Sequence, residues 1–169
     1  MHIVSLAIRL AVLSALLWLA VVDVRARRLP DAGVLFIGAM FFADAWGERL
    51  PPHDVLVHIG IAVFAYAICA VLFALRMMGG GDAKLASVIF LWSGSSLWLL
   101  SLMLISMAGL LVALLSLASR HIGSHHASPL LRALALFSGE RGVPYGVALA
   151  FGGGAAIVLP GLVPLLLPP

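Results

Sequence analysis

The sequence predicts an all-α, polytopic membrane protein with six transmembrane helices. Of its 169 residues, 63% are hydrophobic and only 10% are charged, and the mean hydropathy is +1.18. Soluble domains carry about 25% charged residues, and a small globule has too much surface to hide so large an apolar excess. The apolar residues also gather in long runs between short polar loops, as expected of helices that cross a bilayer.

The first apolar run, residues 3–22, is long enough to cross the membrane as a helix. Arg9 lies inside it and could extend its side chain toward the interface. A cleaved signal peptide is the alternative, but it would need a cleavage site of small residues. The basic stretch DVRARR follows the run directly instead, so we expect a retained span.

Two further spans are expected at about 33–46, which is short, and at about 55–75. The apolar stretch from 85 to 119 is too long for one helix, and Ser93-Gly94-Ser95-Ser96 is the strongest turn signal in it. We therefore expect two spans there, at about 83–94 and 97–119. The polar stretch that follows contains PLLRALALF, which could lie along the interface. A last span at about 144–167 completes a single membrane-embedded domain, residues 1–169.

The distribution of basic residues predicts the orientation of these spans. Lys and Arg gather in the short cytoplasmic loops of membrane proteins, so the loops after the first, third and fifth spans should be cytoplasmic and both termini outside. Three acids, Asp44, Glu48 and Asp54, then fall near the outer face, where water can solvate them. Eight of the ten basic residues lie in those three loops: Arg25, Arg27, Arg28, Arg76, Lys84, Arg120, Arg132 and Arg141.

Two aspartates are predicted to meet at the cytoplasmic face. Asp23 ends the first span and Asp82 begins the fourth, so both should lie at about the same depth. An acid within a span costs about 2.5–3.5 kcal/mol at the helix centre and therefore needs a reason. Two carboxylates that share one water cannot both ionise easily, so one can act as a base while the other, protonated, polarises a carbonyl. This is the arrangement of the aspartic proteases.

Three glycines, Gly79, Gly80 and Gly81, directly precede Asp82. In a helix each costs about 1 kcal/mol relative to alanine. Because glycine has no Cβ, either a substrate backbone or another helix could approach closely at this point. A flexible loop that happens to contain an acid is the simpler interpretation.

Three stretches together resemble the type IV prepilin peptidase family. MGGGDAKL, residues 78–85, is similar to its G-x-G-D box; DVRARRLPD, residues 23–31, is similar to its first box; and VPYGVALA, residues 143–150, is similar to the start of its last helix. The chain has one cysteine, Cys69, and lacks the cytoplasmic region with paired cysteines found in full-length members. It therefore resembles the minimal peptidases of Tad/Flp pilus systems, the CpaA/TadV form.

The resemblance implies a membrane aspartic endopeptidase with Asp23 and Asp82 as its catalytic pair and no cofactor. Its substrate would be a Flp-type prepilin, whose short basic leader ends in glycine and precedes an apolar helix. The implied reaction is leader removal without N-methylation, at the cytoplasmic face of a bacterial inner membrane. Other pilus-assembly proteins are further candidate partners. Nucleic acid is not an expected partner, because the sequence has no basic run with interleaved aromatic residues.

Four other residues are candidates for the substrate cleft, each with a structural alternative. Asp31 stands where the family usually has asparagine; it could cap the helix that follows or face the basic leader. Lys84 could influence the catalytic pair or touch anionic lipid, although a topology anchor is the explanation we favour. Pro144 and Tyr145 could shape the cleft, but both are also ordinary at the start of a span.

The remaining polar and glycine residues have structural explanations. His121, His125 and His126 have no carboxylate nearby, so we expect a solvated loop and no metal. His58 should be a hydrogen-bonded helix contact. Residues 152–154, all glycine, should permit close helix packing.

Two alternative functions differ from leader cleavage by this family. Presenilin-like and signal-peptide-peptidase-like proteases also use G-x-G-D but have a Tyr-Asp first motif, whereas Val22 precedes Asp23 here. A non-enzymatic membrane scaffold or a proton-linked transporter subunit is the other alternative, since paired intramembrane acids also serve in proton relays.

Overall fold

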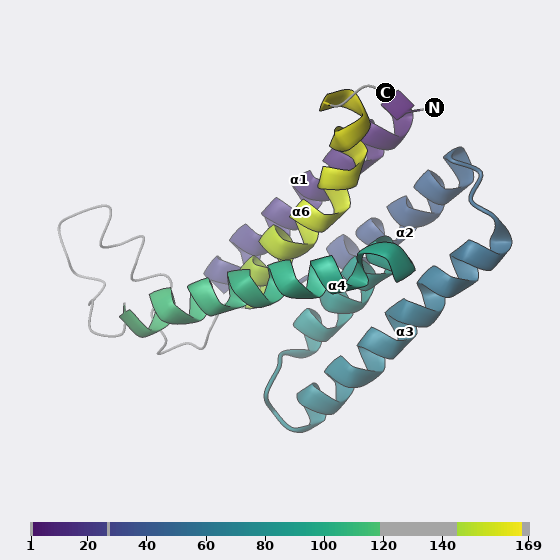
Figure 1. The fold of residues 1–169 in the computed structure, drawn as a ribbon. Coiled ribbons are helices and arrows are strands. Elements are labelled where there is room, and N and C mark those ends of the chain that lie inside the picture. Colours follow the sequence, from purple (N-terminus) through teal and green to yellow (C-terminus); the bar gives the residue numbers. More distant parts are fainter. Residues whose placement is uncertain (1, 27, 119–144, 167–169) are drawn as a thin grey trace.

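The described part of the protein is entirely helical. A computed structural model describes residues 2–26, 28–118 and 145–166, and these residues contain five helices and no strand. The all-α prediction is therefore confirmed for them. The helices are α1 (His2–Ala26), α2 (Asp31–Gly47), α3 (Pro52–Ala74), α4 (Gly80–Ala118) and α6 (Tyr145–Leu166) (Figure 1).

Three of the described helices are long and apolar enough to cross a membrane. They are the segments Ile3–Ala26, Pro52–Ala74 and Gly80–Leu117. The helix bounds agree with the predicted spans within a few residues, but the total of six spans and their orientation stay predictions. Several predicted features lie outside the described residues: the interface stretch at 129–137, Pro144, and His121, His125 and His126.

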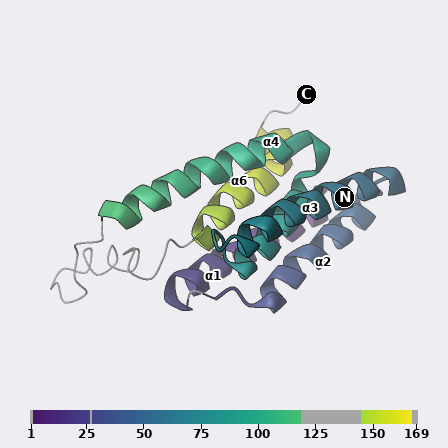
Figure 2. The same ribbon diagram turned by 90° about the horizontal axis from the view of Figure 1, so that it is seen from below.

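The predicted break in the long apolar stretch is confirmed at Gly94. This residue has φ 54° and ψ −161° inside α4, a conformation that is essentially restricted to glycine. The chain reverses direction there, so the two halves of α4 lie at a sharp angle (Figure 2). A Cβ atom on Gly94 would overlap the ring of His58. That ring is held by a hydrogen bond of 2.7 Å between its Nδ1 and the Leu91 carbonyl oxygen, which confirms the expected helix contact.

Consecutive helical segments alternate in direction, so several distant parts of the sequence meet at one end of the bundle. α1 and α6 are antiparallel: Gly146 lies beside Asp23, whereas Arg9 lies beside Ile157. The start of α1 and the end of α6 are therefore neighbours (Figure 1). At the opposite end of these two helices lie Asp23 and the start of α6. The start of α4 joins them there, and we call this the Asp23 end.

Three consecutive glycines fix α6 between its neighbours. A Cβ on Gly152 would lie 2.5 Å from the backbone of Ile105, in the second half of α4. On Gly153 it would lie 2.6 Å from Ile89, in the first half of α4, and on Gly154 it would lie 2.9 Å from Leu13 in α1. The prediction that these glycines permit close helix packing is confirmed. Small residues allow such packing in membranes, where helices gain little from the hydrophobic effect.

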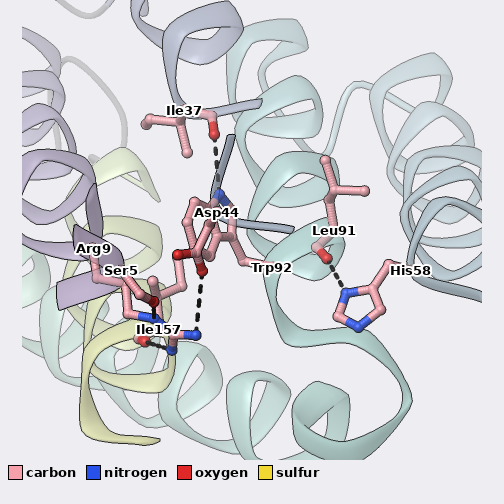
Figure 3. Close-up of polar contacts among 8 residues, drawn as sticks. All are labelled: Ser5, Arg9, Ile37, Asp44, His58, Leu91, Trp92 and Ile157. Atoms are coloured by element: carbon pink, nitrogen blue, oxygen red, sulfur yellow. Dashed lines mark hydrogen bonds and ion pairs between the residues drawn. The ribbon is translucent and has the colours of Figure 1, made fainter. Parts of the chain in front are cut away.

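An ion pair inside the bundle joins α1 to α2. Arg9 Nη2 lies 3.3 Å from Asp44 Oδ2, and Arg9 Nη1 donates a hydrogen bond of 3.0 Å to the Ile157 carbonyl oxygen in α6 (Figure 3). Asp44 is only 6% exposed. The prediction that water solvates Asp44 is therefore wrong, and Arg9 reaches into the bundle to bind it. The pair forms because a buried charge is costly unless an opposite charge accompanies it.

Several aromatic side chains pack against one another beside this ion pair. Trp92 Nε1 donates a hydrogen bond of 3.0 Å to the Ile37 carbonyl oxygen (Figure 3). The Phe41 ring stacks on His58 at 5.1 Å and meets Trp92 edge-on at 5.8 Å. Trp92 is therefore a packing residue that ties α2 to the first half of α4.

Replacing Gly94 with alanine should destabilise the fold, because alanine avoids this backbone conformation and its methyl group would overlap His58. The backbone alone should lower the free energy of unfolding by about 1–3 kcal/mol. Thermal unfolding in detergent micelles measures the effect. Gly60→Ala is the matched control, since a Cβ there meets no atom within 4 Å. Similar melting temperatures for the two variants would contradict the strained turn.

Removing one partner of the Arg9–Asp44 pair should destabilise the protein more than removing both. Asp44→Leu leaves the Arg9 charge unpaired, which typically costs about 3–5 kcal/mol for a buried pair. The double variant Arg9→Met/Asp44→Leu removes both charges and should recover most of that loss. The comparison is again one of melting temperatures. If the loss of stability in the double variant equalled the losses of Arg9→Met and Asp44→Leu added together, the two charges would not be coupled.

Candidate active site

Asp23 lies in the last turn of α1 and is held by the start of α6. Its side chain is buried, and its Oδ2 accepts a hydrogen bond of 3.0 Å from the backbone N–H of Gly146. A Cβ on Gly146 would lie only 2.7 Å from the same oxygen. The absence of a side chain at Gly146 therefore allows α6 to approach and orient the carboxylate.

Asp82 lies in the first turn of α4, where the helix dipole favours negative charge. Its carboxylate folds back onto Gly79 and accepts a hydrogen bond from the backbone N–H of that residue. An acid at this helix position commonly reaches back in this way. The other oxygen, Oδ1, is buried and has no hydrogen-bond partner among the described residues. One side of the carboxylate is thus positioned and the other remains available.

Asp23 and Asp82 line the same pocket at the Asp23 end of the bundle. The pocket has a volume of about 320 Å³ and contains backbone and side chains from α1, from the segment between α1 and α2, and from α4. Asp23 is near enough to act electrostatically on the Asp82 carboxylate. The structure therefore brings together the two acids that were predicted from the sequence to lie at the same end of their helices.

The glycines before Asp82 make room for other parts of the chain. A Cβ on Gly80 would lie 3.3 Å from the Phe73 ring of α3, and a Cβ on Gly81 would lie 2.9 Å from Leu29. Of the two explanations for the glycine run, close packing of the protein on itself is the one that these contacts support. The packing also brings Leu29 to the wall of the pocket.

Asp31 and Lys84 form an exposed ion pair beside the two acids. Lys84 Nζ donates a hydrogen bond of 2.8 Å to Asp31 Oδ1. The prediction that Asp31 caps α2 is wrong, because Pro30 occupies the cap position and no side-chain cap hydrogen bond forms there. Asp31 is instead the first residue of the helix, and its side chain turns to α4. Lys84, a candidate topology anchor, is thereby tied to α2.

Two residues near the start of α6 have different relations to this pocket. Tyr145 is half-exposed and lines a neighbouring pocket of about 360 Å³ between α6 and the second half of α4. Gly146, which holds Asp23, was not singled out from the sequence. The sequence signal that could have identified Gly146 was its position directly after Tyr145, at the start of a predicted span. Arg28 also lines the acid pocket, although sequence analysis assigned it only to topology.

Comparison with known proteins identifies the family. The profile of the type IV leader peptidase family matches residues 10–114, which is more than half of the chain. The chain belongs to the type IV leader peptidase family. The matched range includes Asp23 and Gly79–Asp82. No match was found among curated proteins or among solved structures.

Membership gives the two acids a chemical context, because type IV leader peptidases remove leader peptides from prepilins. The pocket contains two carboxylates, and one of them has an oxygen with no hydrogen-bond partner among the described residues, so the pocket can bind a water molecule at that oxygen. In the part of the chain that the structure describes, no three His, Cys, Asp or Glu side chains are grouped to hold a metal ion.

Replacing Gly146 with alanine should reduce leader removal by this leader peptidase without unfolding it. The new methyl group would meet the Asp23 carboxylate and displace it, and a shift of about 1 Å in a catalytic group can cost about 100-fold in rate. The rate of leader removal from a co-purified prepilin measures the effect. Gly109→Ala is the matched control, since its Cβ would lie 3.9 Å from Ala148, an ordinary contact. Equal rates for both variants would show that Gly146 does not position Asp23.

Proposed function

We propose that this leader peptidase is an aspartic endopeptidase of the GxGD type in which Asp23 and Asp82 form the catalytic pair. The observation that carries the proposal is that both carboxylates line one pocket while Asp82 Oδ1 is buried without a partner among the described residues. The backbone contacts of Gly146 and Gly79 support the proposal further, because they orient both acids from fixed helix ends.

The proposed reaction uses one water and both acids. The ionised carboxylate takes a proton from the water, whose oxygen then attacks the carbonyl carbon of the scissile peptide bond. The protonated carboxyl group donates its proton to the carbonyl oxygen, which gives a neutral tetrahedral intermediate. The intermediate collapses when the acid that took the water proton donates it to the leaving nitrogen, the C–N bond breaks, and the other carboxylate takes back a proton from a hydroxyl of the diol. Each acid ends the cycle able to repeat it.

The proposed substrate is a Flp-type prepilin, cut after the glycine that ends its short basic leader. Leu29 packs closely against Gly81, the residue before Asp82, and both residues form part of the pocket wall. A glycine at the cleavage point suits such a site because a larger side chain would collide with these walls. The lack of a cysteine-rich cytoplasmic region supports cleavage without N-methylation.

The proposed setting is a bacterial inner membrane, with residues 1–169 forming one membrane-embedded domain. Six membrane crossings would result if each half of α4 and each of the other four helices crossed once, with both termini outside. The Asp23 end of the bundle would then face the cytoplasm. The basic residues in the loops at this end support the orientation.

Asp23→Asn and Asp82→Asn should each abolish leader removal while the protein remains folded. Asparagine keeps the shape and can still accept the backbone hydrogen bonds, but it cannot exchange a proton with water. Loss of general acid–base catalysis costs roughly 100- to 10,000-fold in rate. Co-expression with candidate prepilins from the same genome, scored by the shift in prepilin mass, measures the result.

Asp54→Asn is the matched control, since Asp54 is an exposed aspartate in the first turn of another apolar helix, α3. It should process prepilin as the unchanged protein does. Leader removal by either Asp23→Asn or Asp82→Asn at an undiminished rate would disprove the catalytic pair. A protein that moves protons across vesicle membranes and leaves every prepilin uncut would favour the transporter alternative.

A further inference from the structure

A second, larger pocket lies directly beside the acid pocket. It has a volume of about 580 Å³ and lies between α2, α3 and the first half of α4. Asp31 and Lys84 line both pockets, so the two adjoin at this ion pair. The rest of the larger pocket is almost entirely apolar. We call it the α2–α3 groove.

Each helix contributes one face to the groove. α4 contributes Ser87, Val88 and Leu91, which follow Lys84 at the spacing of a single helical stripe. The Ser87 hydroxyl donates to the Ala62 carbonyl oxygen at 3.0 Å, so this polar group is already satisfied. The α4 side of the groove is therefore an apolar surface, because the Ser87 hydroxyl already has a hydrogen-bond partner within the protein.

α2 and α3 form the walls of the groove, and the space between them can hold a further helix. α2 and α3 both pack on α4, whereas their contact with each other is limited and includes the stacked Phe41 and His58 rings. α3 lies at the outside of the bundle (Figure 1). Large side chains on the walls remain exposed: Leu35 by 72%, Phe42 by 48% and Val63 by 62%. Along α2 the groove extends from Asp31 to Phe42, about 16 Å at 1.5 Å per residue. This is about half of the hydrocarbon thickness of a bilayer.

We propose that the α2–α3 groove binds the apolar helix of the prepilin substrate, beginning immediately after the cleavage point. This inference rests on the proposed function and names a second binding surface for it. A groove that adjoins the acid pocket can hold an apolar helix while the leader residues of the same peptide lie at the two acids. The substrate helix would start at the Asp23 end and run parallel to α2.

A matched pair of tryptophan variants tests this. Val63→Trp would fill the groove, whereas Val71→Trp places the same side chain on the same helix outside it, at a similar exposure of 59%. Val63→Trp should raise the KM for a full-length Flp-type prepilin by about tenfold or more, through lost burial of apolar side chains. It should leave unchanged the kcat/KM for a truncated prepilin peptide that extends only a few residues past the scissile bond and is too short to fill the groove. Val71→Trp should change neither.

Photo-crosslinking tests the same surface without filling it. A photoreactive phenylalanine analogue replaces Leu35 or Phe42 in an Asp82→Asn background, in vesicles that contain the full-length prepilin. Both positions should form adducts with the prepilin helix. The residue joined to position 42 should lie about seven residues after the one joined to position 35, because parallel helices advance equally.

The outcomes separate this inference from the proposed function. Prepilin processing that Val63→Trp and Val71→Trp affect equally would overturn the groove and leave the peptidase intact. Adducts only with lipid, or with a second copy of this chain, would also overturn it. If Val63→Trp fails to fold, the crosslinks decide alone. No processing by the unchanged protein would instead count against the proposed function itself.

Discussion

The structure depends most on how closely α6 packs against α1 and against both halves of α4. Three consecutive residues of α6, Gly152, Gly153 and Gly154, each contact a different one of these segments. A side chain at any of them would push one neighbour away. The antiparallel contact with α1 then brings Gly146 onto Asp23, and the contact with α4 holds the helix whose first turn contains Asp82. The geometry of the acid pocket is therefore set by glycines as much as by the acids.

Two kinds of partner distinguish the aspartates of this chain. Asp44 forms an ion pair with Arg9 and Asp31 forms one with Lys84, and each pair joins two helices. The contacts of Asp23 and Asp82 include backbone N–H groups, which orient a carboxylate without adding a full positive charge.

Local patterns in the sequence predicted the helices and the end at which Asp23 and Asp82 meet. The break at Gly94 was also predictable, because a glycine between serines is a local signal. Pairings between helices were not predictable in this way. Arg9 with Asp44 and Asp31 with Lys84 join residues 35 and 53 positions apart, and no local pattern specifies which charge on one helix faces which on another. The donor to Asp23 was missed for the same reason, since its role depends on a contact between the first and last helices.

α2 and α3 are less closely packed than α6. α6 fills the space between α1 and the two halves of α4, while α3 relies on α4 alone for its main contacts. A membrane helix gains little from leaving lipid, so an open groove between α2 and α3 carries no large penalty when empty. A substrate helix would supply a packing surface for the side chains of these two helices that are exposed in the groove. Because the groove ends at the ion pair that also borders the acid pocket, a bound helix would place the residues that precede it beside Asp23 and Asp82.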